Sequence, residues 1–277
     1  VKSGSGDKVE VRVVRELKNA SDDQAKSVFE KHKISLEQKG NTVAIETPEQ
    51  RSIFNSNKMF NKLRVDYTVT VPSKFNLDLK TAGGNIDVAN IEGIVGVRTA
   101  GGNVSLGSIN GPVTASTSGG NVSLESGKGN ADLQTSGGDI RVGELAGDLV
   151  GRTSGGRIHL SKINGKVDVE TSGGDVRVEE AYGPVLARTS GGNVSASILQ
   201  QPKGNCALKT SGGNVDVTLA SDMALALNAR TSGGRVQSDF PGDLSKDRMR
   251  LTAELNGGGP EMLLQTSGGD VHIRKQK

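Results

Sequence analysis

Six basic residues occupy the same position in successive copies of a repeated motif, and together they could bind an anion. The residue directly before each Thr-(Ser/Ala)-Gly-Gly copy is basic six times and acidic once. On stacked strands these cations would lie about 4.8 Å apart and attract an anionic polymer such as an envelope glycan, a teichoic acid or a nucleic acid. The candidate polyanion-binding residues are Lys80, Arg98, Arg152, Arg188, Lys209 and Arg230.

A plainer interpretation of this column is a solvated face of the protein. Asp78, Asp132 and Asp168 lie two positions before members of the column and could offset part of its charge. Charge pairs at a surface contribute little free energy. The solvated face is therefore the simpler of the two interpretations.

The Gly-Gly-x-Val-x-Val pattern is similar in spacing to calcium-binding β-rolls, but its ligands differ. Calcium needs six to eight oxygen ligands, most of them from carboxylates and carbonyls. Arg157 and Arg235 fall in the column where such oxygens would gather. Because Cys206 is the single cysteine, a cysteine-based zinc cluster is excluded as well. We expect no metal and no cofactor.

Candidate catalytic groups are scattered along the chain. A polysaccharide lyase or hydrolase needs clustered carboxylates, and a nucleophilic serine needs a neighbouring base. The acidic residues fall at different positions of the repeat, and the alternation of side chains predicts that the histidines face solvent. These groups are Asp87, Asp132, Asp168 and Asp216, and His32, His159 and His272. We predict no catalytic residue and no enzyme activity.

The repeat itself is the dominant feature of the sequence. Ten copies begin at threonine; the first six intervals are 18 residues, the next two are 21 and the last is 35. Apolar residues alternate with polar ones on both sides of each motif, so each period predicts two short strands. The threonines are Thr81, Thr99, Thr117, Thr135, Thr153, Thr171, Thr189, Thr210, Thr231 and Thr266.

This pattern predicts an all-β fold, a single-stranded parallel β-helix or solenoid of about ten rungs. The usual hand of parallel crossovers favours a right-handed coil. We expect the glycines to supply positive φ at the corners, the threonines to stack inward, and the Asn-rich column after Gly-Gly to hydrogen-bond along the axis. Each rung should stack on the one before it, which leaves the charged residues 272–277 at an outer edge. The insertion at 240–259 should be a loop.

The domain boundaries follow from where the repeat begins. Residues 1–7 are predicted to be a flexible linker, 8–71 an amino-terminal α+β cap and 72–277 the solenoid repeat domain. The cap should contain a strand near Val9, a helix that starts in a capping box at Ser21, and a hairpin around Gly40. An open solenoid end invites pairing with another chain, so a cap is needed.

Composition and charge narrow the possible functions. Aromatic residues make up 3 % of the chain, tryptophan is absent and the net charge is +3, which indicates a thin aliphatic interior and no strong global field. We therefore expect no specific nucleic-acid partner. No apolar run is long enough to span a bilayer. The flexible first residues are consistent with removal of an upstream signal or anchor, so we expect export to the periplasm or cell surface.

Several motifs resemble the bacterial "putative-adhesin" family of β-strand-repeat proteins of unknown function. They are the strand entering at Val71-Pro72, the repeated Ser-Gly-Gly-x-Val-x-Val and the closing Asn256-Gly257-Gly258-Gly259-Pro260 segment. The resemblance covers nearly the whole chain. It implies a β-helical fold and a location outside the cytoplasm, often near the cell envelope, and it carries no known site residues.

The predicted function is that of a non-enzymatic adhesin-like or envelope-associated protein that presents a repetitive surface. Its partner would be an anionic envelope polymer or another protein, and its state a monomer or an end-to-end dimer. The alternative is a self-assembling β-helical scaffold, and a third interpretation is a polysaccharide-binding or polysaccharide-degrading enzyme.

Overall fold

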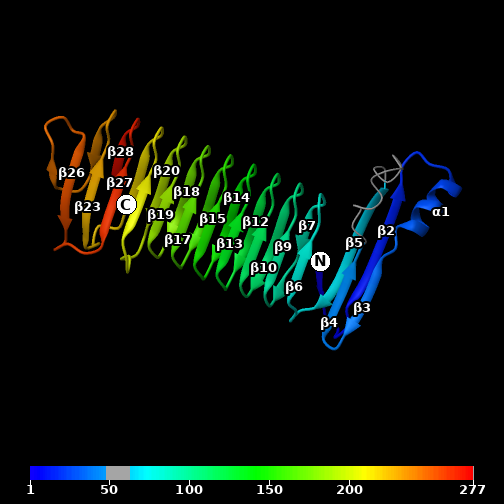
Figure 1. Ribbon diagram of the computed structural model, residues 1–277. Coiled ribbons are helices and arrows are strands. Elements are labelled where there is room, and N and C mark those ends of the chain that lie inside the picture. The colour runs from blue at the N-terminus through cyan, green and yellow to red at the C-terminus, as the bar shows by residue number, and fades with distance from the viewer. Residues whose placement is uncertain (48–62, 277) are drawn as a thin grey trace. The chain divides into compact units, whose positions relative to one another are not determined.

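The computed structural model describes residues 1–47 and 63–276, which fall into two compact units (Figure 1). The first unit ends at Pro72 and the second begins at Ser73. The predicted cap, residues 8–71, includes a stretch at 48–62 that lies outside the described residues. Its role as a cap stays a prediction.

The first unit is an α+β arrangement in which the predicted helix and hairpin are confirmed. Ser21 accepts a hydrogen bond from the backbone N–H of Gln24, whose side chain accepts one from the Ser21 backbone N–H, so the capping box is formed. Strands β3 and β4 pair antiparallel, as do β2 and β5. The elements are β1 Lys2–Gly4, β2 Glu10–Leu17, α1 Asp22–Lys31, β3 Ser35–Lys39, β4 Thr42–Glu46 and β5 Leu63–Pro72.

The expected flexible linker at residues 1–7 contains a strand instead. Strand β1 pairs in parallel with the end of β5, and Lys2 lies opposite Thr70. Gly4 permits the close approach, because a Cβ there would lie 2.9 Å from the Thr70 side chain. The pattern of small and polar residues that suggested a linker is therefore also compatible with an edge strand, whose order comes from backbone pairing.

The second unit is a parallel β-solenoid, as the repeat predicts. One sheet, here the pre-threonine sheet, carries the strands that precede each threonine; over residues 73–276 it contains ten parallel strands and two further antiparallel ones. Its strands are β6 Leu77–Lys80, β9 Val95–Arg98, β11 Val113–Ser116, β13 Ala131–Gln134, β15 Leu149–Arg152, β17 Val167–Glu170, β19 Val185–Arg188, β21 Cys206–Lys209, β23 Leu225–Arg230, β25 Asp243–Leu244, β26 Arg250–Leu255 and β27 Glu261–Gln265.

The other sheet, here the post-glycine sheet, carries the strands that follow each Gly-Gly and also has ten parallel strands in line. The short strand β8 pairs beside them on β10. The strands are β7 Ile86–Val88, β8 Ile91–Glu92, β10 Val104–Asn110, β12 Val122–Gly127, β14 Ile140–Leu145, β16 Ile158–Ile163, β18 Val176–Ala181, β20 Val194–Ile198, β22 Val215–Leu219, β24 Val236–Ser238 and β28 Val271–Lys275.

The core is a thin aliphatic layer between these two sheets. Pairing keeps the 18-residue register, so Val122 lies over Val104 and Ile140 over Val122. These inward side chains are 0–1 % exposed. The alternation of side chains thus separates interior from surface on every rung, and the absence of large aromatics matches the narrow space between the sheets.

In nine of the ten doublets the second glycine is required by close stacking and not by a positive φ; the exception is Gly84, on the first rung. None of the doublet glycines lies in the left-handed region, so the expected positive φ is wrong at these corners; Gly93 and Gly111, at the second corner of their rungs, do have positive φ, at 151° and 158°. A Cβ on Gly156 would instead lie less than 3.0 Å from the backbone of Gly138 on the rung below. The same holds for Gly102, Gly120, Gly138, Gly174, Gly192, Gly213, Gly234 and Gly269.

The threonine column links successive corners through hydrogen bonds. The Thr153 hydroxyl donates to the Gly138 carbonyl at 2.8 Å and accepts from the Gly156 N–H at 3.3 Å. Nine of the ten threonines are buried and repeat this arrangement, and Thr81, on the first rung, is exposed. The inward threonine ladder is therefore confirmed, and it satisfies backbone groups that would otherwise be buried without partners.

The final rung is inserted between two earlier rungs, contrary to the expected order. Strand β27 pairs with both β21 and β23, and β28 pairs with both β22 and β24. In Figure 1 the red β27 and β28 accordingly lie closer to the middle of the solenoid than the orange β23 and β26, which lie at its end. The predicted charged outer edge is wrong for His272 and Ile273, which have β22 on one side and β24 on the other. Among the described residues Arg274 and Lys275 pair with β22 alone, and residue 277 lies outside the described residues.

The insertion at 240–259, expected as a loop, forms the outer end of the pre-threonine sheet. Within it, β26 pairs antiparallel with β23, and β25 pairs antiparallel with β26. Leu251 and Leu255 of β26 are 3 % and 4 % exposed. This reversal of direction covers the edge of β23 with a strand that cannot continue the parallel coil.

We predict that Gly156→Ala lowers the free energy of unfolding by about 3 kcal/mol, since the added Cβ would push against backbone that cannot move without breaking the ladder. Gly155→Ala is the matched control, because its Cβ would lie 3.5 Å from the nearest atom, and it should cost less than about 1 kcal/mol. Denaturant unfolding measures both. Equal midpoints for the two variants would contradict the stacking explanation.

Candidate binding surface

The six predicted polyanion-binding residues lie in one outward column of the pre-threonine sheet. Pairing places Lys80 beside Arg98, and Arg188 beside Lys209. The column differs from the sequence order at one point, because Gln265 stands between Lys209 and Arg230. From β6 to β23 the column reads Lys80, Arg98, Ser116, Gln134, Arg152, Glu170, Arg188, Lys209, Gln265 and Arg230.

Two of the three cations in the amino-terminal half of this column are paired with carboxylates, and the third, Arg98, donates to the Ser116 hydroxyl at 3.3 Å. Lys80 forms an ion pair with Asp78 at 2.9 Å. Arg152 forms one with Asp168 at 2.9 Å and a longer one with Glu170 at 3.9 Å. The compensation expected from the aspartates two positions earlier is therefore confirmed at these two cations.

The carboxyl-terminal half contains cations without such partners. Among residues 1–47 and 63–276, no carboxylate lies within 4.0 Å of the charged nitrogens of Arg188, Lys209 or Arg230. Arg230 donates one hydrogen bond, to the Gln265 side chain at 2.8 Å. We call Arg188, Lys209 and Arg230 the cationic segment.

The neighbouring outward column explains why this segment is unpaired. In the amino-terminal half, three of the six residues at the position two earlier are Asp78, Asp132 and Asp168. Beside Arg188, Lys209 and Gln265 that position carries Leu186, Ala207 and Leu263, and beside Arg230 it carries Asn228. An aliphatic side chain cannot offset a cation. The segment is therefore a half-apolar, positively charged strip.

Arg250 extends the column by one strand and was not anticipated from the sequence. It pairs with Arg230 across the antiparallel β23 and β26. Arg250 also lies near Asp247, whose pKa is lowered mainly by hydrogen bonds from the Ser245 hydroxyl and the Met249 N–H, with a smaller contribution from Arg250. No repeat signal marks Arg250, because it lies in the 35-residue interval.

The histidines occupy three different settings, none shared with another histidine. His159 lies 2.9 Å from the Glu179 carboxylate, and this hydrogen bond lowers the pKa of Glu179. His272 pairs with Asp216 at 3.1 Å. His32, predicted to face solvent, is 8 % exposed, and its burial lowers the pKa of its imidazole. That prediction is wrong for His32 because the residue ends helix α1 against Arg15.

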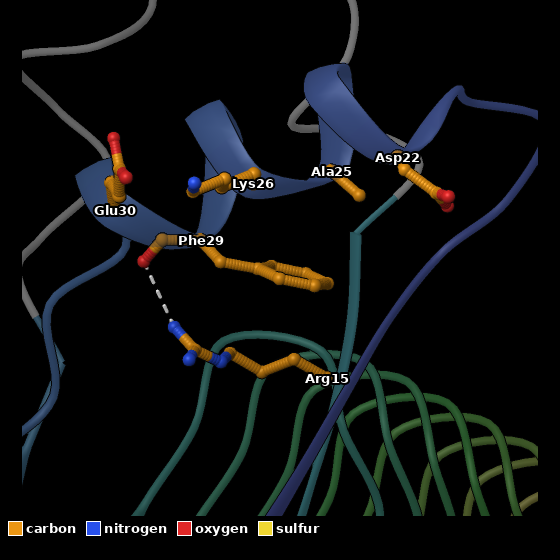
Figure 2. A pocket seen from close by; sticks show the side chains of 6 residues that line it. All are labelled: Arg15, Asp22, Ala25, Lys26, Phe29 and Glu30. Atoms are coloured by element: carbon orange, nitrogen blue, oxygen red, sulfur yellow. Dashed lines mark hydrogen bonds between the residues drawn. The ribbon is translucent and has the colours of Figure 1, made fainter.

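An open depression lies against α1 in the first unit, and Figure 2 shows the side chains that line it. The Arg15 guanidinium lies 4.9 Å from the centre of the Phe29 ring and donates to the Phe29 carbonyl at 2.9 Å and the His32 carbonyl at 3.1 Å. These contacts satisfy carbonyls at the helix carboxyl terminus. Arg15 therefore holds the helix and is not free to bind a ligand.

The column after Gly-Gly uses its oxygens within the fold. The Asn103 Oδ1 accepts from the Asn121 N–H at 2.8 Å, and Asn121 Oδ1 accepts from the Asp139 N–H at 2.8 Å. The predicted axial bonding is thus present, but it runs from side chain to backbone and not between stacked amides. Within the described residues, no group of three or more His, Cys, Asp or Glu side chains could hold a metal ion.

Comparison of the chain with models of known protein families identifies its family. The family model described as Toastrack DUF4097 matches residues 1–274. The chain belongs to the Toastrack DUF4097 family. The resemblance to an adhesin-like β-repeat family is thereby confirmed. No curated protein matches this Toastrack chain.

One solved structure that matches the Toastrack chain is described as a "putative cell adhesion protein" from Clostridium sporogenes. It is 13 % identical, and the match covers 99 % of this chain and 86 % of that one, with a TM-score of 0.20. A similarity with this TM-score supports no conclusion about a site or a function. In the described residues of the Toastrack chain, no helix has the length and hydropathy to cross a membrane.

We predict that Arg157→Asn stabilises the protein by about 1 kcal/mol. Arg157 interrupts the column: its own N–H donates to Asp139 Oδ1, but its side chain has no oxygen that could accept from the Asp175 N–H on the next rung. Asparagine would supply that oxygen, and the exposed 3.9 Å pair between Arg157 and Asp175 that it removes contributes little.

Arg235→Asn is the control for this prediction. Arg235 lies at the same position of the outermost post-glycine strand, where no further parallel strand stacks. Thermal unfolding should show a higher midpoint for Arg157→Asn and no gain for Arg235→Asn. A gain in both would point to a general effect of removing charge.

Proposed function

We propose that this chain is a non-enzymatic interaction module of the cell envelope that binds an anionic polymer along the pre-threonine sheet. The observation that carries the proposal is the cationic segment, three cations in one column with no carboxylate beside them. Paired strands hold these cations at a fixed spacing set by the ladder, about 4.8 Å for adjacent rungs. A polymer with regularly spaced negative charges would meet several of them at once.

The apolar strip beside the cations supports the same proposal. Leu186 and Leu263 are partly exposed and flank Ala207 on the outer face. Low-polarity surroundings weaken the hydration of a bound anion and strengthen its attraction to the cations. The corresponding position in the amino-terminal half carries an aspartate in three of six rungs, and these would repel the polymer. Binding should therefore be confined to the carboxyl-terminal half of the sheet.

The non-enzymatic part of the proposal is supported by how the candidate groups are engaged. The threonine hydroxyls bond to glycine carbonyls, and His159 and His272 bond to separate carboxylates in different rungs. Because the interior is filled by aliphatic side chains, reaction could occur only at the surface. A polysaccharide-degrading activity has no comparable observation in its favour.

The self-assembling scaffold is the second candidate, and the end of the solenoid argues against it. Strand β26 runs antiparallel at the outer edge of β23. A copy that continued the coil would have to pair in parallel with β23, and that edge is occupied. Electron microscopy that reveals regular filaments would restore this alternative.

The proposal predicts salt-dependent binding to inorganic polyphosphate, measured by titration calorimetry at several salt concentrations. Arg188→Gln/Lys209→Gln/Arg230→Gln should weaken binding at least about tenfold and reduce its salt dependence, since fewer ions are released. The control is Arg141→Gln/Lys162→Gln/Arg177→Gln on the post-glycine sheet, which removes the same charge from residues already paired with carboxylates. Equal losses in both triple variants, or no binding at low salt, would reject the proposed surface.

The proposed location rests on the family resemblance and is tested separately. The protein expressed from its complete reading frame in the source cell should be recovered with the periplasmic, surface or membrane fraction. Detection by a specific antibody after cell fractionation measures this. Recovery only with cytoplasmic markers would reject an envelope role while leaving the binding experiment unaffected.

A further inference from the structure

The carboxyl-terminal rung fills a slot whose two walls come from earlier parts of the chain. Strands β21 and β22 form one wall, and β23 and β24 form the other. Within the part of the chain that the structure describes, the wall formed by β23 and β24 makes its parallel strand pairs only with the inserted rung. Before β27 and β28 arrive, both walls therefore present unpaired strand edges of matching direction.

The slot recognises this rung through specific contacts on its inner wall. The Thr266 hydroxyl donates to the Gly213 carbonyl at 2.7 Å, and Asn214 Oδ1 accepts from the Asp270 N–H at 2.9 Å. Asn205 Oδ1 accepts from the Glu261 N–H at 3.0 Å. These bonds are continuations of the columns that run through the whole solenoid.

The outer wall is bonded to the same rung in the same way. The Thr231 hydroxyl donates to the Gly269 carbonyl at 2.7 Å, and Asp270 Oδ1 accepts from the Arg235 N–H at 2.7 Å. The inward side chains of the rung are at most 1 % exposed: they are Met262, Leu264, Val271 and Ile273. The slot thus fits a segment of this sequence from any copy of the chain.

The connection to the slot is a tight reversal that requires left-handed backbone. Three consecutive residues between β26 and β27 have positive φ: Asn256 at 49°, Gly257 at 88° and Gly258 at 77°. Asn256 is of a residue type that tolerates this region, and its side chain donates to the Ser221 carbonyl at 3.2 Å and the Met223 carbonyl at 2.8 Å. An extended connection would relieve this requirement.

We propose that residues 261–276 form an exchangeable closing rung, and that the slot takes the same segment from a second copy of this chain. Exchange in both directions produces a dimer in which each closing rung makes its usual contacts with the partner's walls. The connection at 256–260 opens from a reversal to an extended link. Because the contacts are the same in both forms, connection geometry and protein concentration decide between them.

The connection provides a test that leaves the slot intact. A Cβ on Gly257 would meet no atom within 4 Å, and on Gly258 only the end of the Glu254 side chain at 3.9 Å. Gly257→Val/Gly258→Val therefore penalises only the positive φ of the closed form. The dimer association constant, measured by size exclusion with light scattering after refolding, should rise at least about tenfold. Gly83→Val, at a glycine with open space and no positive φ, should leave it unchanged.

A disulfide identifies which chain fills each slot. Met262 lies directly opposite Cys206 on the adjacent strand, so Met262→Cys places two inward cysteines at neighbouring-strand spacing. After oxidation, the monomer fraction should run as a monomer on a denaturing, non-reducing gel, and the dimer fraction as a covalent dimer. The reduced samples serve as the control.

Two outcomes would overturn exchange. One is a Gly257→Val/Gly258→Val variant that remains monomeric at all refolding concentrations. The other is a dimer fraction whose disulfides lie only within single chains, which would mean that intact monomers associate through their surfaces. Both readouts are made without polyphosphate, so they are independent of the proposed polymer binding.

Discussion

The spacing between hydrogen-bonded parallel strands is the constraint on which this structure depends. With rungs held about 4.8 Å apart, the corners also stack backbone on backbone, and no side chain fits between them. The second glycine of each doublet meets this requirement, as Gly156 over Gly138 illustrates. The threonine beside it then bonds to carbonyl and amide groups exposed by the tight corner. Glycine therefore allows the corners to stack closely, and threonine satisfies the backbone groups that such a corner leaves without partners.

A strict register has a direct effect on the surface. Because side chains at the same position of the repeat lie above one another, a bias at one position becomes a continuous column. Whether the basic column is neutral or charged is decided by the column next to it: aspartate at 168 pairs with Arg152, whereas Leu186 and Ala207 leave Arg188 and Lys209 unpaired. The net charge along the outer face of the sheet thus depends on the residues of both columns.

The sequence predicts the strands, the inward threonines and the basic column well, because each follows from a period within one copy. The order of the last rungs does not follow in the same way. Every copy of the repeat offers its neighbours the same strand ladder and the same threonine and glycine contacts. The copy that begins at Thr266 could therefore stack equally well on the copy at Thr210 or on the copy at Thr231. The placement is decided by the 35-residue interval, whose strand β26 occupies the outer edge. Arg250 and the burial of His32 were missed for a related reason, since both depend on pairing outside the repeat.

The inserted rung gives this solenoid an unusual relation between synthesis and assembly. A coil that stacks in chain order can grow as the polypeptide emerges, each turn settling on the last one made. Here that progression must stop after β22, since the turn made next belongs one layer further out. The gap can close only after β27 and β28 have been synthesised, so two strands that follow β23 and β24 in the sequence fill the space inside them.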